Sequence, residues 1–433
     1  MKNHRLVLWT LLTAAGLLAS ASLWLWLHNF NDGVVLSAGE QDSALLRSPA
    51  QIQRGAYLAQ AGNCMACHTQ RGGPPYAGGR GIETPFGTVF SSNLTPDSAA
   101  GLGNWTPGHF WRAMHHGRSQ NGRLLTPVFP YTSYTQITRA DSDALFAYLH
   151  SLPPVAQANL PHSLRWPFGT QAALAVWRSL YFKPAEFAPA PTQSAEWNRG
   201  AYLVQGLGHC SACHAARDAL GGSDPLGLAG GLIPRQNWYA PSLLSSTEAG
   251  VADWPLADIA ALLKTGTSPR GQANGPMANV VLHSTQHLHD ADLLAMARYL
   301  KALPPESARA ASAGQTTQAA TRASTGSPRG AALYEQHCQQ CHGGAGQGIA
   351  GAYPALAGNR AVLLPVTANL VQSVLYGGYG PATAGNPRPY GMPPYVLVLN
   401  DRDLAAVLTH LRSAWGNTAP AVTELEVAQQ RQP

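Results

Sequence analysis

Lysine and arginine are nowhere concentrated in this 433-residue sequence, and its formal net charge is +6. Proteins that bind nucleic acid usually carry a basic run, so nucleic acid is not an expected partner. The sequence also lacks a glycine fingerprint for nucleotides between a predicted strand and helix. It shows no evident pairing of a nucleophile with a base either. No residue is therefore predicted to be catalytic.

Cysteine is scarce as well, and all six cysteines fall into three copies of one pattern, C-x-x-C-H. A disulfide framework needs no histidine after each pair. Structural zinc uses four ligands, usually from cysteine pairs about 12–20 residues apart, and these pairs lie much farther apart. A thioredoxin-like redox motif would not occur three times. The pattern is the attachment signature of c-type haem. Its three copies are Cys64, Cys67 and His68, then Cys210, Cys213 and His214, then Cys338, Cys341 and His342.

Three covalently bound haem c groups are therefore the predicted cofactors. In each motif the two cysteine sulfurs, one helical turn apart, would form thioethers to one porphyrin. The histidine that follows would supply the proximal nitrogen to the iron. Haem attachment of this kind takes place outside the bacterial cytoplasm, so the periplasm is the expected compartment.

Residues 6–27 contain no charged side chain and are mostly apolar, and this length suits one membrane crossing. Lys2 and Arg5 precede the stretch, and the next basic residue is Arg47. The positive-inside rule then places the N-terminus in the cytoplasm. The rest of the chain is predicted to lie on the periplasmic side of the bacterial inner membrane.

A cleaved signal peptide is the alternative for residues 1–30, because Ala19-Ser20-Ala21 resembles a cleavage site. Cleavage there would leave an apolar segment containing Trp24 and Trp26 exposed at a soluble N-terminus. The segment is therefore predicted to be an anchor or a signal segment, and the uncleaved anchor is favoured.

Each haem motif sits in a repeated unit. An Arg-Gly-Ala sequence precedes each motif, and a helical pattern with Asp or Ser near its start closes each unit at 142–149, 290–300 and 401–411. An N-terminal and a C-terminal helix crossing beside one haem is the small cytochrome c architecture. We predict an all-α fold of three tandem cytochrome c-like domains. Their residues are 51–155, 193–304 and 328–417, with a flexible linker over 305–327.

Two further stretches lie outside these units. The segment through Trp166, Trp177 and Phe182 is too apolar for a free linker, so we expect it to pack on a domain or a partner. The tail after Trp415 looks polar, and no structural role is expected for it.

A low-spin electron-transfer haem takes a second axial ligand, commonly Met. Of the six methionines, Met277 and Met392 each adjoin a proline on a predicted loop before the closing helix of a unit. A methionine in a core is the alternative, but this placement suits a ligand better. Met277 is predicted for the second haem and Met392 for the third.

The first unit departs from this pattern. The segments 105–117 and 254–266 align by their Trp-to-Gly spacing, and Phe129 then falls at the ligand position, where it cannot coordinate iron. Three possibilities remain for the sixth ligand position of the first haem: Met114, a histidine (His115 or His116), or an iron left open. Met114 is favoured, although the same alignment places it opposite Leu263, a position expected to be buried.

These motifs in combination resemble the triple-haem cytochrome c subunit of bacterial membrane-bound alcohol, gluconate, sorbitol, fructose and aldehyde dehydrogenases. The resemblance covers about residues 50–417. A branch similar to the cytochrome partners of molybdenum-dependent aldehyde or N-heterocycle hydroxylases also has Phe at 129 and Met at 114, which is why Met114 is favoured. The stretches that carry the resemblance are 54–58, 84–88, 92–97, 275–278, 353–359 and 413–417.

The resemblance implies a non-catalytic relay subunit. A separate catalytic dehydrogenase subunit, of the flavin, quinone or molybdenum type, would oxidise the substrate. Electrons would pass through the three haems here to ubiquinone or to a terminal oxidase. Two other functions remain open: a free-standing membrane cytochrome that shuttles electrons between respiratory complexes, and an enzyme whose open first iron binds a small ligand such as peroxide.

Overall fold

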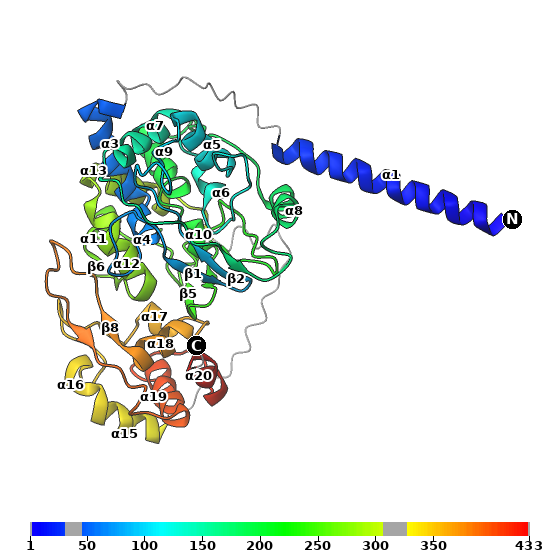
Figure 1. Cartoon of the computed structure of the whole chain (residues 1–433). Coiled ribbons are helices and arrows are strands. Elements are labelled where there is room, and N and C mark those ends of the chain that lie inside the picture. The colour runs from blue at the N-terminus through cyan, green and yellow to red at the C-terminus, as the bar shows by residue number, and fades with distance from the viewer. Residues whose placement is uncertain (1, 31–45, 306–326, 432–433) are drawn as a thin grey trace. The chain divides into compact units, whose positions relative to one another are not determined.

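The computed structural model describes residues 2–30, 46–305 and 327–431 (Figure 1). Its contacts divide the chain into two compact units. Unit 1 comprises Met1–Leu58, Cys67–Phe187 and Asp218–Gly222, and unit 2 comprises Ala59–Ala66, Ala188–Arg217 and Ser223–Pro433. Residues 306–326 of the predicted linker lie outside the described residues.

The same pair of crossing helices occurs three times. In each pair a helix just before a C-x-x-C-H motif packs against a later helix. The pairs are α3 (Pro49–Ala61) with α7 (Arg139–His150), α9 (Ala195–Gln205) with α13 (Asp290–Lys301), and α15 (Pro328–His337) with α19 (Asp401–Ser413). The later helices contain the three closing segments predicted from sequence.

The Arg-Gly repeat has a physical reason at these crossings. The glycines face the backbone of the partner helix so closely that a Cβ would clash with a carbonyl oxygen: Gly55 with Ala144, Gly200 with Ala295 and Gly330 with Ala406. The preceding arginines form ion pairs across the same crossings: Arg54 with Asp141, Arg199 with Asp292 and Arg329 with Asp403. Each aspartate lies in the first turn of its helix, where a negative charge is favourable.

The long helix α1 (Lys2–Phe30) and several shorter elements complete the described part of unit 1. The helix α1 contacts α8 (Gln171–Tyr181), and the strands form one antiparallel sheet in the order β1-β2-β3. The remaining elements of this unit are α5 (Pro107–His116), α6 (Tyr131–Tyr134), β1 (Gly81–Thr84), β2 (Gly87–Phe90) and β3 (Ser163–Leu164); α4 (Cys64–His68) spans the division between the units.

Unit 2 has three two-stranded antiparallel sheets. They are β4 (Gly231–Ile233) with β5 (Trp238–Ala240), β6 (Thr267–Ser268) with β7 (Gly271–Gln272), and β8 (Gly378–Tyr379) with β9 (Gly391–Met392). The all-α prediction omitted such ladders because strands of two to four residues are too short to show alternation. The further helices are α10 (Ser211–His214), α11 (Leu256–Thr265), α12 (Gly275–His283), η1 (Thr285–His287), α16 (Gln339–His342), α17 (Arg360–Leu363), α18 (Ala368–Tyr376) and α20 (Glu424–Arg431).

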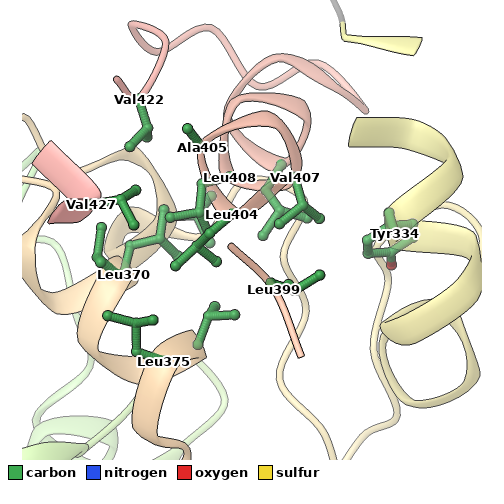
Figure 2. Close-up of a cluster of buried hydrophobic side chains, with 14 residues drawn as sticks. Tyr334, Leu370, Leu375, Leu399, Leu404, Ala405, Val407, Leu408, Val422 and Val427 are labelled. Carbon is green, nitrogen blue, oxygen red and sulfur yellow. The ribbon is translucent and has the colours of Figure 1, made fainter. Parts of the chain in front are cut away.

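The C-terminal tail belongs to a hydrophobic core, contrary to the sequence prediction. Figure 2 shows Val422 and Val427 beside Leu370, Leu404 and Leu408, and both valines are almost fully buried. The helix α20 packs on α18 and α19. Two valines in an otherwise polar segment give too weak a pattern to reveal this packing from sequence.

The aromatic segment between the first two sequence repeats packs against other residues of the compact unit 1, as expected. Phe182 is 6% exposed and its ring lies edge-on to Tyr131, with centroids 4.8 Å apart. The indole of Trp177 donates a hydrogen bond to the carbonyl of Leu220 over 3.1 Å. Trp166, by contrast, is 86% exposed.

Candidate haem sites

Each C-x-x-C-H motif forms a short helical turn. In the second motif the His214 amide donates to the Cys210 carbonyl over 2.9 Å, and in the third the His342 amide donates to the Cys338 carbonyl over 3.0 Å. This i to i+4 bond places the first cysteine and the histidine on the same face of the turn. None of the six cysteines forms a disulfide, so each pair is available for thioether formation.

The three motif histidines share one orientation. The Nδ1 atoms of His68, His214 and His342 lie 2.7, 2.7 and 3.0 Å from the backbone carbonyl oxygens of Ser92, Pro241 and Pro354. A carbonyl only accepts, so Nδ1 carries the proton and Nε2 keeps its lone pair for a metal. This outer hydrogen bond is the usual means of orienting a ligating histidine. The residues therefore fit an axial role toward a haem iron.

The charge state of the histidines agrees with that role. Burial lowers the pKa of His68 and of His214, in each case against the opposing effect of the hydrogen bond to the carbonyl. The neutral imidazole, which is the ligating form, is thereby favoured.

A glycine that the sequence analysis missed completes each motif. The histidine carbonyl accepts from the amide of Gly78, Gly230 or Gly348 over 2.8, 2.7 and 2.8 Å. All three glycines have left-handed φ values of 78°, 84° and 66°. A side chain there would also strike the neighbouring backbone or the Tyr239 hydroxyl. The signal in the sequence was a glycine 6–16 residues after each motif, which is too variable in spacing to recognise.

Cys210 and Cys338 are not set up as thiolates. Burial raises the pKa of Cys210 to about 12 and that of Cys338 to about 11. Reactive or metal-bound thiolates instead occur where nearby positive charge lowers the pKa. Among the described parts of the chain, no three His, Cys, Asp or Glu side chains gather as ligands for a bare metal ion. The donor set thus fits haem attachment better than zinc binding.

Met277 and Met392 both precede the closing helix of their unit, but neither lies in an open loop. Met277 is in the first turn of α12, where Pro276 occupies an N-terminal position, and Met392 is in β9, paired with Gly378. Both are partly exposed. Regular backbone on either side of each side chain limits the positions its sulfur can take.

Met114 lies in α5 and is 4% exposed, and Leu263, its aligned counterpart in α11, is 8% exposed. The alignment is sound, because α5 and α11 both end at a left-handed glycine, Gly117 and Gly266. Met114 therefore shares the burial of a core leucine, and burial alone does not distinguish a ligand from a core residue.

The other candidates in the first unit are placed as follows. The His115 ring stacks on Trp111 with centroids 4.4 Å apart, and its Nδ1 is 3.5 Å from the Thr135 hydroxyl. Burial lowers the pKa of His115. The Phe129 ring packs against Tyr134, with centroids 5.4 Å apart.

Within unit 2 the second and third repeats are in direct contact. The Tyr239 amide donates to the Asn369 side-chain oxygen over 2.8 Å, and the Asn369 side-chain nitrogen donates back to the Tyr239 carbonyl over 2.7 Å. Arg360 pairs with Asp253 over 3.1 Å. Two C-x-x-C-H motifs therefore lie within one compact unit.

Comparison with known proteins places these features in a class. A family model for cytochrome c matches residues 52–153 and 327–415, so both stretches are cytochrome c domains, a class that holds haem c covalently and transfers electrons. The chain is 38% identical to the cytochrome c subunit of the quinone alcohol dehydrogenase of Gluconacetobacter polyoxogenes. That match covers 90% of this chain and 86% of the relative.

Two further relatives are similar over most of this chain. The cytochrome c subunit of gluconate 2-dehydrogenase from Pantoea cypripedii is 38% identical over 88% of this chain and 90% of its own length. A nicotinate dehydrogenase subunit from Pseudomonas putida is 39% identical over 86% of this chain, but the match spans only 31% of that longer protein. The chain belongs to the family of dehydrogenase cytochrome c subunits.

Proposed function

We propose that the chain relays electrons through three covalently bound haem c groups, from a catalytic dehydrogenase subunit to ubiquinone or to the respiratory chain. The observation that carries the proposal is the threefold repetition of one local arrangement. Each copy has two cysteines that form no disulfide, a histidine whose Nδ1 faces a carbonyl, and a left-handed glycine bonded to the histidine carbonyl.

The residues are assigned to the haems as follows. The two cysteines of each motif would form the thioethers, and His68, His214 and His342 would be the proximal ligands. Met277 and Met392 would be the sixth ligands of the second and third haems, and Met114 that of the first. A haem supplies one-electron chemistry, while the protein sets its position and potential through the axial ligands and the surrounding burial.

The partner is inferred from the relatives. Their names include quinone alcohol dehydrogenase, gluconate dehydrogenase and nicotinate dehydrogenase. A catalytic subunit with a quinone, flavin or molybdenum cofactor is thus the proposed electron donor, and its substrate would be an alcohol, a sugar acid, an aldehyde or a heterocycle.

The proposed location is the periplasmic side of the bacterial inner membrane, with α1 as an uncleaved anchor. Residues Val7–Phe30 form a helix long and apolar enough to cross a membrane, although a signal sequence would pass the same test. N-terminal sequencing of the mature protein distinguishes the two: a start near Ser22 would rule out the anchor.

A purification from native membranes in mild detergent tests the relay. The chain is tagged at its C-terminus, stained for covalent haem and assayed for haem content, and all co-purifying chains are identified. We expect three haems per chain and a large dehydrogenase subunit in fixed ratio. A haem-stained chain recovered alone, under conditions that preserve other complexes, would instead support the free-standing shuttle.

A further inference from the structure

The helix α8 in unit 1 has its polarity reversed relative to an ordinary surface helix. Its only charged residue, Arg178, is 4% exposed, whereas Val176 and Leu180 are 46% and 61% exposed. Ala172, Val176 and Leu180 are four residues apart and therefore share one face of the helix, and all three are exposed. A helix at a water surface normally shows polar residues there.

The end of the apolar helix α1 contacts α8 (Figure 1), and buried polar side chains join the two helices. Asn29, which is 2% exposed, accepts a hydrogen bond from Arg178 Nε over 3.0 Å. Its side-chain nitrogen donates to the Ala175 carbonyl over 3.1 Å and to the Ser179 hydroxyl over 3.0 Å. The inward charge of α8 is thus used to hold the end of α1.

A second arginine closes the same helix end. Arg118, which is 8% exposed, donates from Nη1 to the Phe30 carbonyl over 3.1 Å, and its guanidinium lies 5.3 Å from the Phe30 ring centroid. A cation at the last carbonyl satisfies an orphan acceptor and the negative end of the helix dipole. The Phe30 ring packs against a buried cluster that contains Leu124 and Leu174.

The exposed side of α1 near this junction is mostly apolar, and the exposed His28 ring stacks on Trp24 with centroids 5.2 Å apart. Leu23, Trp24, Trp26 and Leu27 are between 45% and 58% exposed. In a membrane-spanning helix, tryptophans near the end lie at the level of the lipid head groups. Because α8 is bonded to α1 at Asn29, within two turns of these residues, α8 is held at the same level.

We propose that the exposed face of α8, formed by Ala172, Val176 and Leu180, lies on the periplasmic surface of the lipid bilayer. This rests on the proposed membrane anchor. An apolar helix lying in the interface buries its apolar face at the boundary of head groups and acyl chains. Lipid is favoured over a protein partner because α8 is bonded directly to the end of the proposed membrane span. The contact would fix the orientation of unit 1 on the membrane.

Photolabelling tests this in the full-length haem-loaded protein, reconstituted into vesicles of phosphatidylethanolamine and phosphatidylglycerol. A diazirine reagent that partitions into the bilayer is activated, and labelled peptides are mapped by mass spectrometry. We expect label on residues 171–181 as well as on 7–30. In the double variant Val176→Asp, Leu180→Asp, the α8 label should fall to background while the α1 label persists. Both positions are exposed, so the fold should tolerate the change, and haem content verifies it.

The control is Leu232→Asp, at a residue 58% exposed in unit 2, which should leave both labels unchanged. Label on α1 with none on α8 in the unmodified chain would overturn the inference and leave the anchor standing. Absence of label from both would refute the anchor and the inference together. Labelling is repeated on the complex with its catalytic subunit. Loss of the α8 label there, with cross-links from α8 to that subunit, would make this face a protein interface and overturn the lipid assignment.

Discussion

The crossing of α9 and α13 depends on the absence of a side chain at Gly200. A Cβ there would clash with the Ala295 carbonyl oxygen and would lie 2.9 Å from Tyr299 Cβ. The obstructing atoms are backbone and the base of a side chain, so no rotamer change relieves the contact. In Gly200→Ala the helices must therefore separate, which loosens the Arg199–Asp292 ion pair and the Trp197–Tyr299 ring contact.

Two opposing contributions set the size of the effect. Overpacking of a tight contact costs about 1–3 kcal/mol, and alanine favours a helix over glycine by about 1 kcal/mol. We expect Gly200→Ala to lower the free energy of local unfolding by about 1–2 kcal/mol. The clash involves a rigid carbonyl, so the overpacking cost should lie at the high end of its range. This corresponds to a roughly 5–30-fold rise in the open population.

Hydrogen exchange of the α9 and α13 amides measures this loss locally, without requiring the whole chain to unfold in two states. The matched control is Gly16→Ala in α1, where nothing lies within 4 Å of the added Cβ; it should leave exchange in α9 and α13 unchanged. A Gly200→Ala protein with wild-type or slower exchange in both helices would refute the packing argument.

Single contacts give three further predictions. Asn369→Ala removes both hydrogen bonds to Tyr239 and should weaken the contact between the second and third repeats by about 1–3 kcal/mol, seen as faster exchange of the Tyr239 amide. Burial lowers the pKa of His150 below its ordinary 6.5, so the folded state binds fewer protons than the unfolded state. The stability of the fold should therefore fall as the pH drops below 6.5 and through the folded-state pKa. His150→Gln should flatten that part of the plot of melting temperature against pH. Met114→Leu conserves volume, with an expected stability cost under about 1.5 kcal/mol, and should remove one of three sulfur–iron absorption bands.

Each of these has a contrary outcome. Unchanged exchange at Tyr239 in Asn369→Ala would show that the repeats are held by other contacts such as Arg360 with Asp253. An unaltered pH profile in His150→Gln would show that the pKa of His150 does not differ between the folded and unfolded states. A Met114→Leu protein that keeps every sulfur–iron band would exclude Met114 as a ligand. Met392→Leu is the variant for comparison, because removal of the Met392 sulfur should remove the sulfur–iron band of the third haem.

The sequence by itself predicted the chemistry of the sites. Its six cysteines fall into three C-x-x-C-H motifs, the signature of covalent haem attachment. It also indicated the repeated helix pair, since Arg-Gly before each motif and Asp or Ser near the start of each closing helix recur. Local patterns of this kind predict the structure well because the residues of the motif lie within about one helical turn of each other.

Contacts between distant residues were decided only by the tertiary structure. The glycines in the Arg-Gly repeat had no visible reason until each was found against a carbonyl roughly 75–95 residues away. Other contacts likewise join segments that no sequence periodicity connects. They are the bonds of the three histidines to backbone carbonyls, the packing of Val427 in the core, and the hydrogen bond from Arg178 to Asn29. Packing geometry depends on side chains brought together by the whole fold, and a linear pattern records only what lies near in the chain.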